Sequence, residues 1–325
     1  MKAPSMKLLV ASLLLMLVVS ALVSLTIGPM DIPLSSMFSS PVLQLRLYRV
    51  LLAVIAGAGL SVSGVILQGL LRNPLAEPYI LGISSGAGLS AVLVISSGVL
   101  VSIPWFIPGA AFIGGLATVF LVFWLASATV KKSTPTSLLL SGVVVNSILG
   151  SAMMYIISSS PSGELHSVIW WLLGNLQLFN GDILVATLVP VAVCFVIALR
   201  YSGHLDLIQL GDQPAQHLGL DIRRARVILL VLSSLMTGTI VAACGLIGFV
   251  GLIVPHSVRA VTGSTHKKLM YVSALGGSVF LVLSDLLART VVSPREVPIG
   301  VITSLFGGIF FFTILRRRRS ESWFF

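Results

Sequence analysis

The sequence predicts an all-α, polytopic membrane protein with about ten transmembrane helices. Of its 325 residues, 56% are hydrophobic and 9% are charged, and the mean hydropathy is +1.07. That composition excludes an ordinary water-soluble globule. The apolar residues form runs of about 20, the length with which an α-helix crosses a hydrocarbon core about 30 Å thick. Because such runs fill most of the chain, we expect a single transmembrane domain over residues 1–325.

Nine of the expected spans are clear in the hydropathy pattern. They are residues 8–27, 50–71, 80–101, 106–128, 137–157, 183–199, 227–243, 269–288 and 297–315. A tenth, short or broken, is expected over residues 245–256, where the apolar run continues and glycines allow close helix packing. The first run could be a signal peptide, but it is longer than a typical h-region and no A-x-A-like site ends it. We therefore expect it to be the first span.

The distribution of positive charge predicts the orientation of these spans. An even number of spans places both termini on one side, and a cytoplasmic N-terminus puts sixteen of the 20 basic residues in inside segments. The outside then keeps only Arg46, Arg49, Arg289 and Arg295. The net charge of +10 is thus explained by orientation, and the run at residues 316–319 favours an anchor on anionic membrane lipid. No nucleic-acid partner is expected.

The predicted spans carry almost no chemistry-bearing side chains. Their one carboxylate, Asp285, lies four residues before Arg289, so an i,i+4 ion pair is expected. The five histidines show no metal-ligand spacing, and Cys194 and Cys244 lie in apolar runs. No G-x-x-x-x-G-K-[ST] phosphate loop is present. We therefore expect no catalytic residue, metal or cofactor, and any ATP hydrolysis would belong to a separate subunit.

Two polar stretches between spans show helix signals. In the first, residues 205–226, Asp212 and Pro214 are placed as a helix start and Gly219 as a stop, although an ordinary solvated loop fits the composition equally well. In the second, residues 162–178, the Trp170–Trp171 pair favours a short amphipathic helix at the outer interface.

A third polar segment joins the second and third spans. It reads QGLLRNPLAEP over residues 68–78, and LGISSGA follows at residues 81–87. Pro74 and Pro78 block a continuous helix, and Asn73 and Glu77 supply side chains that can cap helix ends.

This segment resembles the permease subunits of type II ABC importers for iron chelates, haem and cobalamin. The resemblance extends through GDQPAQHLG at residues 211–219, GFVGLIVPH at residues 248–256, DLLAR at residues 285–289 and EVPIG at residues 296–300. It implies a bundle like that of the cobalamin permease in a bacterial or archaeal cytoplasmic (inner) membrane. It also implies three partners: an ATPase dimer, an extracytoplasmic substrate-binding protein and a second permease copy, identical or related. The implied cargo is a ferric siderophore, haem or a cobalamin-like molecule. A stand-alone secondary transporter or channel is the alternative.

The resemblance also implies roles for particular residues. A coupling helix that inserts into the ATPase would lie in the 205–226 loop, with matches at Gly211, Asp212, Ala215, Leu218 and Gly219. Arginines matching Arg46, Arg49 and Arg289 would bind glutamates of the substrate-binding protein, and Arg favours such bidentate pairing. The alternative is that these arginines are interface anchors.

A cytoplasmic gate is implied around Asn73 and Leu75, and around Thr136 and Ser137. The alternative is that these four residues simply cap and pack helices. Small and weakly polar residues at 57–68 and 82–87 have the character of a pathway lining. The segment at 162–178 would form the outer gate.

Overall fold

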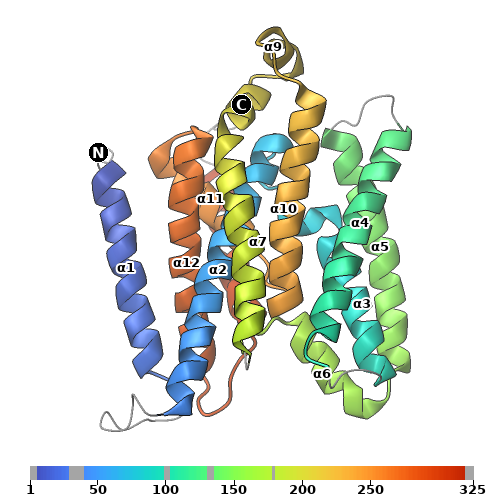
Figure 1. The fold of residues 1–325 in the computed structure, drawn as a ribbon, viewed down its shortest axis with the longest axis vertical. Helices are drawn as coiled ribbons and strands as arrows, with labels where there is room; N and C mark the ends of the chain where they lie inside the picture. The colour runs from blue at the N-terminus through green and yellow to red at the C-terminus, as the bar shows by residue number, and fades with distance from the viewer. Residues whose placement is uncertain (1–5, 29–39, 99–102, 130–134, 178–179, 319–325) are drawn as a thin grey trace.

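The computed structural model describes residues 6–28, 40–98, 103–129, 135–177 and 180–318, and its regular elements are all helices (Figure 1). In order they are α1 (Met6–Thr26), α2 (Pro41–Leu70), the 3-10 helix η2 (Pro78–Leu81), α3 (Ile83–Ser97), α4 (Phe106–Thr129), α5 (Pro135–Ser159), α6 (Ser162–Leu172), α7 (Gly181–Arg200), α8 (Ser202–Gln209), α9 (Asp212–His217), α10 (Ile222–Cys244), α11 (Val250–Thr262), α12 (His266–Thr290) and α13 (Ile299–Arg318).

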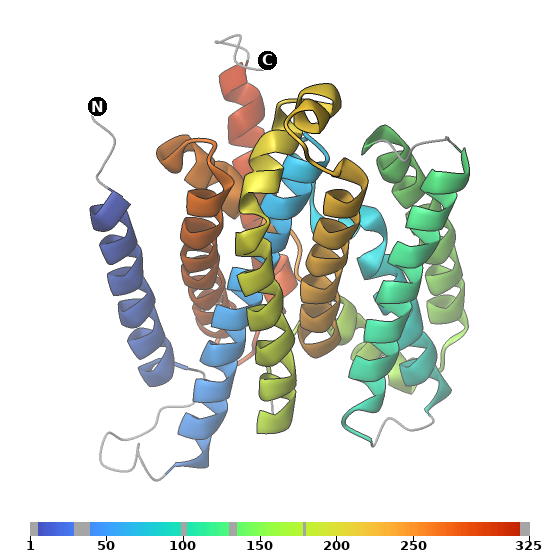
Figure 2. The same cartoon turned by 45° about the horizontal axis from the view of Figure 1, so that its top comes forward.

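The predicted number of membrane helices is confirmed within the described ranges. Seven helices (α1, α2, α4, α5, α7, α10 and α12) are long and apolar enough to span a membrane, and α3, α11 and α13 contain shorter apolar helices. The expected short span is α11, which begins after a break at residues 245–249. Helix α1 starts, and α13 ends, at the end of the bundle where α9 lies (Figure 2).

Helix α2 forms the centre of the bundle, packed by α7, α10, α11 and α12. It begins where the Ser40 hydroxyl accepts a hydrogen bond from the Val42 amide at 3.2 Å, with Pro41 at its first position. A Cβ on Gly57 would overlap a carbonyl oxygen of α12, and one on Gly64 would overlap the Gly251 carbonyl oxygen of α11. These glycines let the helices approach backbone to backbone.

The expectation that residues 57–68 line the pathway is therefore wrong. All of them except the half-buried Ala58 are buried within this one chain. Small residues suit a channel wall and a tight helix crossing equally well, and here they serve the crossing.

Two breaks in the helices meet inside the bundle and satisfy each other's backbone groups. The Tyr79 hydroxyl donates to the Ile247 carbonyl at 2.8 Å and accepts from the Ile247 amide at 2.9 Å. The Glu77 carboxylate accepts from the Phe249 amide at 2.5 Å, at the start of α11. Irregular backbone away from water needs such partners. The prediction that Glu77 caps a helix end is confirmed.

Asn146 in the middle of α5 completes this arrangement. Its amide nitrogen donates to the Tyr79 and Ile80 carbonyls at 3.3 and 3.2 Å, and its oxygen accepts from the Ser85 hydroxyl at 2.6 Å. Asn146 was not predicted to have a role; a lone amide in an apolar span was the available signal.

Candidate functional site

Helix α9 projects beyond the other helices at one end of the bundle (Figure 1). It follows Gly211, with φ +116°, and is followed by Gly219, with φ +84°, a region that glycine adopts without steric cost. The Gly219 and Leu220 amides donate to the Gln216 and Ala215 carbonyls at 2.9 and 3.1 Å and close the last turn. The predicted helix start and stop are confirmed.

Asp212 ties this tip to two long helices. Its carboxylate accepts from the Arg226 guanidinium of α10 at 2.8 and 3.0 Å and forms an ion pair with Arg72, just after α2. Arg72 also donates to a backbone carbonyl of α8, that of Ile208, at 2.8 Å. These contacts hold α9 against α10 and the end of α2.

A further contact joins α8, which precedes the tip, to α12. The Asp206 carboxylate of α8 accepts from the His266 amide at 3.0 Å and lies 2.6 Å from its ring nitrogen Nδ1. This carboxylate satisfies a free amide in the first turn of α12.

The five predicted coupling residues have different places in the tip. Gly211 and Gly219 shape its turns, Asp212 anchors it, and Ala215 is buried beneath it. Leu218 is 62% exposed, and Leu210 close by is 63% exposed. The structure therefore presents two leucines at the tip of a firmly held loop.

The Asp212 anchor has a defined pH dependence. Partial burial raises the pKa of this carboxyl, but Arg226 and Arg72 outweigh burial, and the net pKa lies below its ordinary value. A folded-state pKa below the unfolded one stabilises the fold above the unfolded pKa, and that contribution disappears as pH falls through the depressed value. The anchor is thus fully present at neutral pH.

Asp212→Asn at pH 7 should reproduce the loss of this anchor. We expect hydrogen exchange at the Leu220 amide to accelerate by up to about fivefold, because half-exposed ion pairs contribute at most about 1 kcal/mol. Mass spectrometry of peptides covering residues 211–220 measures it. Asp182→Asn, an exposed carboxylate in the first turn of α7, is the control. Equal exchange in wild type and Asp212→Asn would contradict the anchoring role.

A second cluster lies at the opposite end of the bundle, where α2 begins and α12 ends. Arg49 donates to Asp285 and to Glu296, both at 2.8 Å, and Gln177 donates to Glu296 at 2.9 Å. Asp285 also lies 3.1 Å from the Arg289 guanidinium, which confirms the predicted i,i+4 ion pair.

Two arginines of this second cluster also hold α1. Arg46 donates to the Leu25 and Thr26 carbonyls at 3.0 and 2.9 Å, and Arg289 donates to the Ser24 carbonyl at 3.1 Å and to the Ser24 hydroxyl. These carbonyls belong to the last turn of α1, which has no intrahelical donors for them and favours cations.

All three predicted docking arginines are therefore brought together and buried. Arg46, Arg49 and Arg289 are 5, 8 and 2% exposed. Their partners Glu296 and Ser24 were not predicted, because no local pattern connects these residues to the arginines.

The predicted gate residues lie on separate elements. The Asn73 side chain accepts from the Leu75 amide at 2.9 Å in the turn after α2. Thr136 is exposed and Ser137 half-buried, both in the first turn of α5. Asn73 thus shapes its own turn, and a gate formed by these four residues stays a prediction.

The predicted outer-interface helix is α6, at the end opposite α9 (Figure 1). It ends at Leu172, earlier than the expected 178, because the following residues pair with other helices. The Asn175 amide donates to the Cys244 carbonyl at 2.7 Å, and the Gly300 amide donates to the Leu173 carbonyl at 2.9 Å. Residue 178 lies outside the described ranges.

No group of three or more His, Cys, Asp or Glu side chains that could hold a metal occurs among the described residues. Both cysteines are buried and free.

Comparisons with known proteins agree over nearly the whole chain. The sequence model of the FecCD transport family matches residues 15–317. The hemin transport system permease protein HmuU of Yersinia pestis is 37% identical, with 97% of each chain covered. The Fe(3+) dicitrate transport system permease protein FecD of Escherichia coli is 37% identical, over 92% of this chain and 95% of its own length.

A solved structure has the same fold. It is an inward-facing conformation of an ABC transporter of the metal-chelate type, 32% identical, with a TM-score of 0.86. The alignment covers 96% of this chain and 99% of that one.

Proposed function

The chain belongs to the FecCD transport family, and from that premise we propose that it is the permease subunit of an ATP-driven importer. Its cargo would be an iron chelate, as ferric siderophore or haem, or a cobalamin-like molecule. Relatives named as permeases for hemin, Fe(3+) dicitrate and cobalamin support this substrate class. The chain itself would perform no catalysis, since ATP hydrolysis would belong to a separate ATPase subunit.

The observation that carries the proposal is the anchored tip at α9. A pair of exposed leucines flanking a helix held by Asp212 suits insertion into a cleft of an ATPase, because apolar contacts give affinity and the ion pairs would transmit force. The ATPase dimer would then lie on the cytoplasmic side, where both termini also lie. A stand-alone secondary transporter would have no use for such a tip.

Leu218→Asp tests this assignment. We expect the ATPase subunit to be lost during co-purification and transport-coupled ATP hydrolysis in proteoliposomes to fall at least tenfold, because a carboxylate in an apolar cleft is left without a partner. Val261→Asp is the matched control, since Val261 is 43% exposed in the last turns of α11. Solute movement along an ion gradient by the purified chain alone would instead favour the secondary transporter.

We also propose that Arg46, Arg49 and Arg289 receive the substrate-binding protein. These arginines already have partners within the chain. A glutamate of the binding protein would therefore compete for the Arg49 guanidinium with Glu296, whose side chain is 18% exposed. Such internal competition lowers apparent affinity by the fraction of arginine that is free.

Glu296→Gln should therefore raise the affinity for the substrate-binding protein by roughly threefold to tenfold. Titrating ATPase stimulation with the binding protein measures this affinity. Glu164→Gln, an acidic residue in the first turn of α6, is the control. An unchanged or weaker affinity in Glu296→Gln would mean that Arg49 serves only the fold.

A second permease copy, identical or related, would complete the pathway. Of the residues in the most apolar 18-residue stretch of α5, 11% are buried within the chain, against 83% for the corresponding stretch of α2. We propose that two copies enclose the pathway at their interface, with Asn73, Leu75, Thr136 and Ser137 at its cytoplasmic gate.

A further inference from the structure

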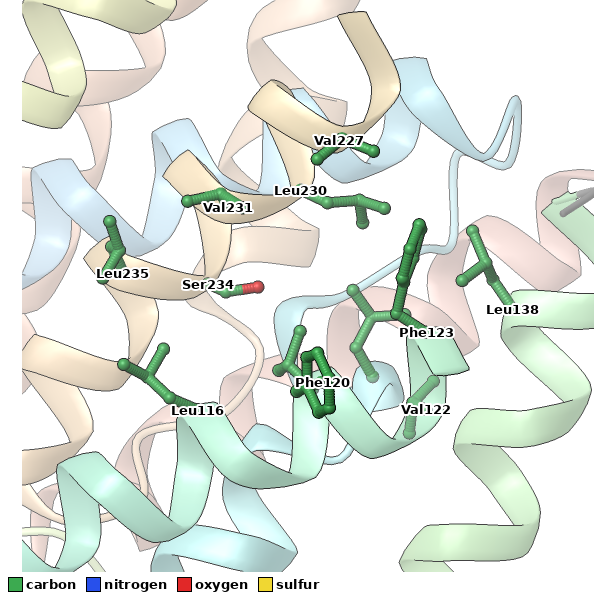
Figure 3. Close-up of a pocket in the computed structure, with 12 residues that line it drawn as sticks. Leu116, Phe120, Val122, Phe123, Leu138, Val227, Leu230, Val231, Ser234 and Leu235 are labelled. Carbon is green, nitrogen blue, oxygen red and sulfur yellow. The ribbon is translucent and has the colours of Figure 1, made fainter. Parts of the chain in front are cut away.

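An apolar groove of about 350 Å³ runs between α4 and α10 (Figure 3), beside the part of α10 that follows α9 in the chain. Its walls include Leu116, Phe120 and Phe123 from α4 and Val227, Leu230 and Val231 from α10. The volume is in the range of small-molecule sites.

One polar side chain, Ser234, lines this groove. It is 2% exposed, its hydroxyl has no hydrogen-bond partner, and it points into the groove in Figure 3. A hydrocarbon occupant would not offer this hydroxyl a hydrogen bond, so the apolar walls, and not Ser234, indicate what the groove holds.

Two arginines lie at the end of the groove where α10 begins. Arg223, Val227, Leu230 and Ser234 are spaced i, i+4, i+7 and i+11, so they share one face of the helix. Val227 also borders a shallow surface hollow formed with Asp221, Arg223 and Arg224, so the hollow and the groove adjoin. Both arginines are exposed, and among the described residues neither forms an ion pair.

The dimensions match one leaflet of a bilayer. At a rise of 1.5 Å per residue, the groove wall from Val227 to Leu235 is about 12 Å long, and Arg223 lies about 6 Å beyond it. Half of a hydrocarbon core about 30 Å thick is about 15 Å. The arginines therefore stand at headgroup level when the groove stands at acyl-chain level.

We propose that this groove binds an anionic phospholipid, with an acyl chain between α4 and α10 and the phosphate on Arg223 and Arg224. Basic sites beside gaps between membrane helices suit anionic headgroups. A second copy of this chain is the alternative occupant, and the test below distinguishes it from a lipid.

Native mass spectrometry of the full chain, purified in detergent and delipidated, tests the proposal. We expect phosphatidylglycerol to bind about 30-fold more tightly than phosphatidylcholine of the same acyl chains, since each arginine near an anionic headgroup contributes about a fivefold preference. Arg223→Gln/Arg224→Gln should abolish this preference. Val231→Trp, at a 49% exposed position of the groove, should weaken the binding of both lipids because the larger side chain fills the groove.

Matched controls separate the site from general surface charge. Lys267→Gln/Lys268→Gln removes two exposed charges at the start of α12. Val193→Trp adds a tryptophan at a 52% exposed position of α7. Both controls should keep the preference for phosphatidylglycerol over phosphatidylcholine. Equal binding of the two lipids by wild type, or equal losses in the controls, would overturn the proposal. The proposal would also be overturned if Val231→Trp changed dimerisation and left lipid binding unchanged. The same holds if Arg223→Gln/Arg224→Gln changed ATPase retention and left lipid binding unchanged.

Discussion

Asp285→Asn is expected to lower the free energy of unfolding by about 3–5 kcal/mol, because it leaves buried guanidinium groups without their shared carboxylate. Asp285 is 1% exposed and contacts both Arg49 and Arg289. The substitution preserves side-chain shape, so no cavity contributes. Thermal unfolding in detergent should show an apparent Tm lower by roughly 5–10 °C.

The comparison for Asp285→Asn is Asp182→Asn, an exposed carboxylate of the α7 first turn at the same end of the bundle. Surface changes of that kind stay within about 0.5 kcal/mol. Asp285→Leu/Arg289→Met should recover part of the loss, because well-packed apolar side chains can replace a buried ion pair. Equal melting of Asp285→Asn and wild type would refute the contribution of this cluster.

Gly64→Ala is expected to be nearly as damaging, at about 3 kcal/mol or more. A Cβ at this position would overlap the Gly251 carbonyl oxygen, so α2 and α11 must separate. Overpacking of a core ordinarily costs about 1–3 kcal/mol, and a backbone obstacle relaxes less than a side chain. Yield of monodisperse protein and its apparent Tm measure the effect.

Gly109→Ala provides the control for this steric prediction. Gly109 lies near the start of α4, and a Cβ there meets nothing within 4 Å. Alanine is the better helix former by about 1 kcal/mol, so this variant should match or exceed wild-type stability. If both variants melted alike, close packing at Gly64 would not be limiting.

The sequence was sufficient for the membrane helices and for the local turns. Whether a segment spans is decided by its own length and apolarity, so each of the ten expected segments overlaps an apolar helix, seven of them long enough to span a membrane. Asp212 and Gly219 bound α9 as expected, because helix starts and stops depend on adjacent backbone groups. The Asp285–Arg289 pair follows from helical spacing alone.

The tertiary structure decided which of these residues meet across the chain. Arg49 and Glu296 are 247 positions apart, and Arg289 and Ser24 are 265 apart, so no local pattern joins them. The glycines of residues 57–68 suited a channel lining by composition, but helix crossings bury them. The groove between α4 and α10 likewise exists only because two helices with their own apolar faces come to lie side by side. Local physics fixes what each segment forms, whereas the partner of a side chain depends on how the whole bundle packs.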